Sequence, residues 1–424
     1  MRNKGKLSEK RVIWIIFTLA LTLHLAFAIM EFERSGTSHW ADSWEYWDIG
    51  RQFADGNWYP SRIIGTGESF VVVAPMLPIL VAGGILIFGT SFWPIIILNA
   101  LAAAAMVVVF YLLGRELFSK TTGYLAAGLS MLDVTFYRYI TQVLKEPLVY
   151  LLVPLTVLFL VKYVKSDLRL RYVAGSAISF TLLIHTDERY FIYTPFILLF
   201  LMIPLFRKQW RAIKHLAIWM VILIVTMIPW TIRNYRQFGQ VVLLSPRTTA
   251  FTSLVWGDAI TDEHFQTEIT DPRLSPHYAS AVEMGRKYGK KPRIYGRYEK
   301  YLIAFKHYWQ PIFPKLEFQT YGFRPIRWSM MHNLTGMLFY GIFLPFYLLG
   351  SHKILRRKEI LAYPLVFLPL LHSLLHTFTL YALERYRYAV NFCVVLIGIW
   401  MLCAIFQWLK RKLIHTAPAD LVGS

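Results

Sequence analysis

Residues 92–113 read FWPIIILNALAAAAMVVVFYLL, an apolar run that contains no charged side chain. A helix rises about 1.5 Å per residue, so about 20 such residues are needed to cross the hydrocarbon core of a bilayer. Similar runs recur along the 424-residue chain, in which 56% of the residues are apolar and only 17% are charged. A soluble chain would carry about a quarter charged residues. The sequence therefore predicts an all-α polytopic membrane protein and excludes an ordinary cytosolic enzyme.

Two of the apolar runs need separate interpretation. The run from Val12 to Met30 follows a basic start and lacks a small-residue cleavage site, so it is interpreted as a retained anchor. The run from Phe70 to Phe88 contains two prolines and a Gly-Gly pair, and counting it as a span would place Arg115 and Lys120 outside. We therefore predict that it is a re-entrant or interfacial helix. About ten spans remain: 12–30, 92–113, 122–137, 147–163, 172–186, 190–206, 215–232, 334–350, 360–380 and 388–409.

The distribution of charge predicts the orientation of the chain. The 45 Lys and Arg residues exceed the 25 Asp and Glu residues, and most of the excess lies in short clusters between apolar runs. The positive-inside rule then puts both termini in the cytoplasm, and the excess is a topology signal with a second use in attracting membrane lipids, so no nucleic-acid partner is predicted. The outer segments instead mix carboxylates with cations, the composition of a site. These outer groups are Asp42, Lys145, Glu146, Asp187, Glu188, Arg189, Arg233, Glu384, Arg385 and Arg387.

The same pattern predicts three regions. Residues 1–232 form an N-terminal transmembrane module with a first outer loop at 31–70. Residues 233–333 form a large extracytoplasmic loop whose second half suits an interfacial helix, and residues 334–424 form the C-terminal transmembrane helices.

Common catalytic motifs are absent from the sequence. It contains no GxxxxGK[ST], GxGxxG, HExxH or GxSxG pattern, so ATP-driven transport and serine hydrolysis have no motif support. For Asp42 and Glu146 a structural interpretation stands beside the functional one. Asp42 could be a helix N-cap, and Glu146 could be a carboxylate that interacts favourably with a helix dipole. His372 and His376, at i, i+4 spacing, favour a structural hydrogen-bonding pair. Arg385 and Arg387 are not required by topology and favour a phosphate partner.

Several motifs, taken in order, resemble one family of membrane enzymes. They are ADSWEYWDIGRQFADGNWY (41–59), APMLPILVAG (74–83), KEPLVYLLVPLTVLFL (145–160), HTDERYFIYTPFILLFL (185–201), MIPWTIRNYRQFGQVVLLS (227–245) and ERYRYAVNF (384–392). The chain resembles the GT-C class of integral-membrane glycosyltransferases, in particular the bacterial family 39 group related to protein O-mannosyltransferases and to the aminoarabinose transferase of lipid A. The chain departs from the family pattern RPPGYP at 74–83 and lacks the proline of RYRLP at 384–392.

This resemblance implies a GT-C type helical bundle and a glycosyl transfer reaction. A sugar carried on a polyprenyl phosphate would pass to an acceptor hydroxyl outside the cytoplasm, at the inner (plasma) membrane, with inversion. Asp42 would be the general base and Glu146 would hold the acceptor or assist. Cations would stabilise the leaving phosphate: Lys145, Arg189, Arg233, Arg385 and Arg387. Groups expected near the acceptor or sugar are Glu45, Tyr46, Asp187 and Glu188. No obligatory metal or other cofactor is predicted, with a divalent cation as the alternative.

Three alternatives stay open at this point. A transporter or flippase of a polyprenyl-linked sugar would use the same cations without a base, and it would favour charges near the bilayer midplane. A non-catalytic assembly subunit would not need Asp42. An O-antigen-ligase type enzyme is kept open by His264, His277 and His307 in the large loop.

Overall fold

The computed structural model describes residues 8–35, 41–58, 73–133, 137, 139–239, 241–244, 302, 305–306, 308–311, 334–378 and 384–416. Most of the predicted outer loop 233–333 lies outside the described residues, including His264, His277 and His307. The described part consists of helices and contains no strand.

The helices follow the apolar runs of the sequence. In chain order they are α1 (Glu9–Ser35), α2 (Ala41–Ala54), α3 (Met76–Phe88), α4 (Trp93–Leu117), α5 (Lys120–Leu132), α7 (Glu146–Lys165), α8 (Leu170–Thr186), η1 (Glu188–Tyr193), α9 (Thr194–Leu201), η2 (Ile203–Arg207), α10 (Arg211–Phe238), η4 (Gly341–Phe343), α16 (Leu344–Arg357), η5 (Ile360–Ala362), α17 (Tyr363–Phe378) and α18 (Glu384–Thr416).

Within the described ranges, eight helical stretches are long and apolar enough to cross a membrane. They are Glu9–Arg34, Trp93–Leu117, Glu146–Lys165, Glu188–Phe206, Arg211–Arg236, Leu334–Arg357, Ile360–Thr377 and Tyr386–Lys412. The other two predicted spans correspond to α5, with 13 residues, and α8, with 17 residues, and both pack against longer helices. The all-α polytopic fold that the apolar runs predict is confirmed.

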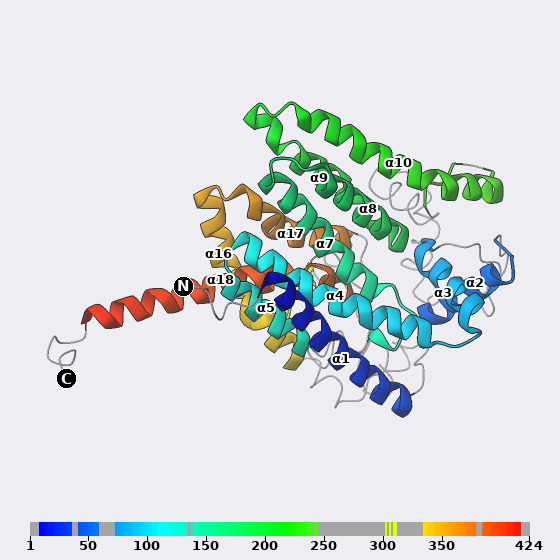
Figure 1. Cartoon of the computed structure of the whole chain (residues 1–424), viewed down its shortest axis with the longest axis horizontal. Helices are drawn as coiled ribbons and strands as arrows, with labels where there is room; N and C mark the ends of the chain where they lie inside the picture. Colours follow the sequence, from blue (N-terminus) through cyan, green and yellow to red (C-terminus); the bar gives the residue numbers. More distant parts are fainter. Residues whose placement is uncertain are drawn as a thin grey trace.

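Helix α3 is the helix predicted to re-enter or lie in the interface. Its 13 residues make a helix of about 20 Å, which is too short for a hydrocarbon core of about 30 Å. It packs mainly against α2, and both helices lie at one end of the bundle (Figure 1). A Cβ atom on Gly50 of α2 would lie 2.4 Å from the Val81 side chain of α3, so only glycine permits this approach.

The bundle is built around α4, α7 and α18. Helix α4 packs against α1, α5 and α7, while α7 packs against α8, and α8 packs against α10. Helix α18 packs against α16, α17 and α7, and its C-terminal part extends away from the bundle (Figure 1). Gly114 of α4 and Gly123 of α5 let these two helices touch. A Cβ atom on Gly123 would lie 2.5 Å from the carbonyl oxygen of Tyr111.

Helix direction defines two ends of this bundle. Helices α7 and α18 begin, and α8 and α17 end, at the end where α2 lies; we call this the site end. Large apolar side chains remain exposed around the outside of the helices, as a lipid-facing surface requires. Examples are Trp14, Leu19, Ile87, Leu199, Phe206 and Val221.

Candidate active site

Five ionisable residues converge at the site end from two connections between helices. Lys145 precedes α7 and Glu146 is its first residue, whereas Asp187, Glu188 and Arg189 follow α8 and open η1. Glu146, Asp187 and Glu188 are all buried. We call these five residues the ionic centre. Such groups are costly to bury, so their convergence marks a functional-site candidate.

Asp187 lies between the two cations of the ionic centre. Its Oδ1 accepts a hydrogen bond from Arg189 Nε at 2.8 Å and one from the Arg189 backbone N–H at 3.2 Å, and its Oδ2 pairs with Arg189 Nη2. The same Oδ2 lies 3.1 Å from Lys145 Nζ. The Asp187 side chain is only 2% exposed, against 12% for Lys145 and 19% for Arg189. The carboxylate is therefore enclosed, while both cations still reach the surface.

Electrostatics keep both members of the Lys145–Asp187 pair charged. Burial alone would raise the pKa of the Asp187 carboxyl, but Arg189 and Lys145 lower that pKa well below its usual range. Burial likewise opposes the charge of Lys145, but Asp187 together with Tyr46 and Glu188 outweighs burial, so the pKa of Lys145 is raised. Proton transfer between these two groups is thus disfavoured, and their role is electrostatic.

Helix α2 lies over the ionic centre through Tyr46. Burial raises the pKa of the Tyr46 hydroxyl, and Lys145, Glu146 and Asp187 are close enough to act on it electrostatically. Helix α2 begins at Ala41, so Asp42 lies in its first turn and not at an N-cap. One helical turn separates Asp42 from Tyr46, which puts their α-carbons on one face of α2.

The structure describes less of three further predicted groups. The Asp42 and Arg385 side chains lie outside the described part of the chain, although the backbones of both residues belong to α2 and α18. The Glu45 side chain is half-buried on α2.

Arg387 lies in the first turn of α18 and is buried. Its Nη1 donates to the carbonyl oxygens of Tyr308 at 3.0 Å and Gln310 at 2.7 Å, and its guanidinium lies 3.8 Å from the ring centroid of Tyr340. Its Nε–H is buried and has no hydrogen-bond acceptor among the described residues. The described part also holds no carboxylate that forms an ion pair with Arg387. Within the described residues, this cation therefore has one unused donor and no paired carboxylate.

Arg233 is engaged in a different way. Its Nε and Nη2 donate to the carbonyl oxygen of Trp58, at 3.1 and 2.9 Å, and its Nη1 donates to Asn234. Asn234 and Trp230 in turn bond the carbonyl oxygens of residues 242–244 that follow α10. The PWTIRNY segment thus ties the end of α2 to the segment that follows α10.

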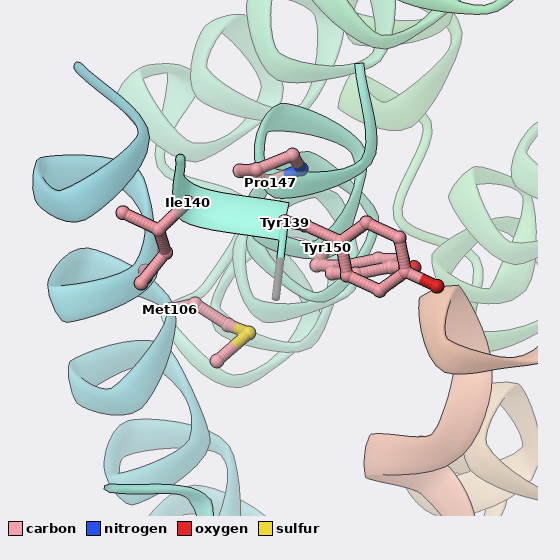
Figure 2. Close-up of a pocket in the computed structure, with 6 residues that line it drawn as sticks. Met106, Tyr139, Ile140, Pro147 and Tyr150 are labelled. Atoms are coloured by element: carbon pink, nitrogen blue, oxygen red, sulfur yellow. The ribbon is translucent and has the colours of Figure 1, made fainter. Parts of the chain in front are cut away.

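A small, tightly packed apolar pocket lies beside Pro147, the second residue of α7. Met106 of α4, Tyr139, Ile140, and Pro147 and Tyr150 of α7 line it, as Figure 2 shows. The rings of Tyr139 and Tyr150 meet edge to face with centroids 6.0 Å apart, and Tyr150 meets Tyr388 of α18 at the same distance. These ring contacts connect the start of α7 to the first turns of α18.

Sequence reasoning missed the aromatic part of the site. The guanidinium of Arg189 lies 4.1 Å from the ring centroid of Tyr386, and the rings of Tyr190 and Tyr193 pack beside it around His372. The available signal was the repeated Arg-Tyr pairing in DERY and ERYRY, which places a ring next to each cation. Within the described ranges, no group of three or more His, Cys, Asp or Glu side chains is placed to hold a metal ion.

Comparison with known proteins gives a family match and a shared fold. Residues 72–232 match the family model of dolichyl-phosphate-mannose-protein mannosyltransferases. The archaeal oligosaccharyltransferase AglB from Archaeoglobus fulgidus, in complex with an inhibitory peptide and a dolichol-phosphate, superposes with a TM-score of 0.58 at 15% identity, over 98% of this chain and 53% of that chain. The A. fulgidus oligosaccharyltransferase tethered with an acceptor peptide gives a TM-score of 0.57 at 16% identity, over 98% and 52%.

A third structure, ArnT from Cupriavidus metallidurans in the apo state, gives a TM-score of 0.42 at 13% identity, over 93% of this chain and 78% of that chain. The chain spans about half the length of the oligosaccharyltransferase chains that it matches. Comparison with curated proteins yields no significant sequence match. The predicted resemblance to GT-C glycosyltransferases is confirmed.

Proposed function

We propose that this protein is an inverting glycosyltransferase that moves a sugar from a polyprenyl-phosphate donor to an extracytoplasmic acceptor hydroxyl. One observation carries the proposal: buried carboxylates and cations meet at one end of a GT-C-type bundle, where α7 and α18 begin. The structure of AglB, which has a similar fold, is a complex with an inhibitory peptide and a dolichol-phosphate, and this supports a lipid phosphate as the donor group. With the site end facing outward, both termini are cytoplasmic, as the basic clusters predict.

The reaction needs a base on one side and positive charge on the other. The acceptor oxygen attacks the anomeric carbon as the base takes its proton, and the bond from that carbon to the phosphate oxygen breaks. The electron pair leaves with the polyprenyl phosphate, and attack from the opposite face inverts the anomeric configuration. We assign the base to Asp42, one turn from Tyr46 on α2, and the acceptor contact to Glu146, Glu188 and Glu45.

The cations divide into two sets by their partners. Arg387, which has an unused N–H and no paired carboxylate among the described residues, is assigned to the leaving phosphate together with Arg385. Lys145 and Arg189 face the same site with partial exposure, but Asp187 compensates part of their charge. We assign Arg233 to shaping the end of α2, because its N–H groups already bond the Trp58 carbonyl and Asn234.

A transfer assay tests this function. The purified protein is placed in lipid with radiolabelled undecaprenyl-phosphate sugars and an envelope extract as acceptor, beside Asp42→Asn and the matched control Asp55→Asn from the exposed turn after α2. Label is expected to reach an acceptor with the wild type and the control and to fall at least about 100-fold with Asp42→Asn. Equal transfer by Asp42→Asn would remove the base from this assignment. Movement of labelled lipid across the bilayer without any transfer would instead establish the transporter.

A further inference from the structure

A cluster of rings lies next to the ionic centre, where α17 ends and α18 begins. It consists of Tyr190, Tyr193, Tyr308, His372, His376 and Tyr386, which we call the imidazole–tyrosine cluster. The His372 ring stacks on Tyr190 with centroids 5.5 Å apart and meets His376 at 4.4 Å. The His376 ring stacks in turn on Tyr386 at 4.8 Å and on Tyr308 at 6.2 Å. His372 is fully buried in the middle of this set.

Both ring nitrogens of His372 have defined partners. Nε2 lies 2.9 Å from the backbone carbonyl oxygen of Tyr386, and Nδ1 is hydrogen-bonded to the Tyr193 hydroxyl. A carbonyl oxygen only accepts, so Nε2 carries the proton of a neutral ring and Nδ1 accepts from Tyr193. His372 therefore has one required tautomer, and its N–H group is committed to the backbone of α18.

Tyr386, whose carbonyl oxygen accepts the hydrogen bond from His372, also contacts the ionic centre. The Tyr386 ring lies under the guanidinium of Arg189, at 4.1 Å from ring centroid to Cζ. Arg189 in turn makes the paired hydrogen bonds to Asp187. The next residue, Arg387, points its guanidinium at the carbonyl oxygens of residues 308 and 310. A shift in the first turn of α18 would thus move two cations of the site together.

We infer that His372 is a positioning residue of the transfer reaction. By donating from Nε2 to the Tyr386 carbonyl it sets the first turn of α18, which places the Tyr386 ring against Arg189 and Arg387 at the leaving phosphate. This inference rests on the proposed function for its chemistry. The contacts on which it depends stand apart from the assignment of the base.

Two substitutions separate positioning from packing. His372→Gln keeps an N–H group at about the reach of Nε2, whereas His372→Asn reaches only as far as Nδ1 and loses the bond to Tyr386. His215→Gln is the control, because His215 lies near the start of α10 at the opposite end of the bundle. The readouts are KM and kcat for the lipid donor, the unfolding temperature, and binding of undecaprenyl phosphate followed by tryptophan fluorescence.

We expect His372→Asn to lower kcat/KM for the donor about tenfold, mainly through KM, and to weaken undecaprenyl phosphate binding by a similar factor. His372→Gln is expected to stay within about threefold of the wild type. Because His372→Asn also leaves the Tyr386 carbonyl without its donor and so loses some stability, both variants are assayed well below their unfolding temperatures. Equal donor kinetics and binding for the two variants would overturn the inference, as would losses that only follow the unfolding temperature.

Measuring both sugar transfer and undecaprenyl phosphate binding distinguishes a failure of this inference from a failure of the proposed function. If the wild type transfers no sugar but binds undecaprenyl phosphate, and His372→Asn alone weakens that binding, the transferase assignment fails while the positioning role stands. A wild type that neither transfers nor binds overturns both.

Discussion

Replacing Asp187 by asparagine would remove the carboxylate that pairs with both Lys145 and Arg189. The wild-type carboxylate pairs with Lys145 Nζ at 3.1 Å and accepts from Arg189 Nε at 2.8 Å, with a further bond to Nη2. Removing one partner of a buried ion pair costs about 3–5 kcal/mol, because a charge is left uncompensated. The cations retain 12% and 19% exposure and can partly rehydrate, so the lower limit applies. We expect Asp187→Asn to lower the free energy of unfolding by about 3 kcal/mol.

The assay is chemical unfolding in detergent micelles, followed by tryptophan fluorescence. Asp48→Asn is the matched control, since Asp48 pairs with a single cation, Arg51, that is 48% exposed. Such a pair contributes about 0–1 kcal/mol, so the control is expected to stay within about 1 kcal/mol of the wild type. An Asp187→Asn protein that also stays within that range would refute the role of Asp187 in compensating the two cations.

The pH dependence of stability gives an independent check on the same carboxylate. The pKa of Asp187 in the folded state lies below its unfolded value of about 3.9, so its contribution is present above that value. The contribution is lost as the pH falls through the folded pKa. Between about pH 5 and pH 3 the wild type is therefore expected to lose more stability than Asp187→Asn. Lys145, whose pKa is raised, contributes below about pH 10.4 and loses this contribution as the pH rises through its folded pKa.

Three further substitutions test the packing and the loop contacts. Gly123→Ala places a Cβ atom against the backbone of α4 and is expected to lower the unfolding temperature, whereas Gly128→Ala in the same helix meets nothing within 4 Å and should stabilise by about 0.5–1 kcal/mol. Asn99→Leu leaves two carbonyl oxygens in the segment before α7 without their donor, at 3.1 and 2.9 Å, and should cost about 2 kcal/mol by chemical unfolding. Arg233→Lys cannot form the forked contact with the carbonyl of Trp58, so hydrogen exchange at the end of α2 is expected to rise.

Local pattern was enough to predict most of the fold. Apolar runs of near-spanning length and basic clusters between them predict the helices and their alternating direction, because both signals depend only on neighbouring residues. The two prolines and the Gly-Gly pair between Phe70 and Phe88 correctly indicated a short helix, α3. Lys145, Glu146 and the segment 187–189 were also found this way, since charges at the ends of apolar runs are rare and conspicuous.

The partners of these charges could not be predicted, because they depend on contacts between distant segments. No local sequence pattern shows that the Arg233 guanidinium donates to the carbonyl of Trp58, 175 residues away. The same is true of Arg387, which donates to the carbonyls of residues 308 and 310. Backbone carbonyls are present at every residue and carry no sequence signal. His372 was recognised only as half of a hydrogen-bonding pair, since its contact with Tyr386 depends on how α17 packs against α18.

The energetics of the ionic centre indicate why its charges are present. Removing buried ions from water costs several kcal/mol each, and well-packed apolar residues of similar volume often stabilise a protein as much or more. A bundle that already packs α7 against α8 and α18 has no structural need for Lys145, Asp187 and Arg189 between them. The proposed function, in which the site holds a lipid phosphate and accepts a proton, would require fixed charges of both signs in a poorly hydrated place. In that case Asp187 positions Lys145 and Arg189 but leaves their positive charges available to a ligand, because both side chains retain exposed surface.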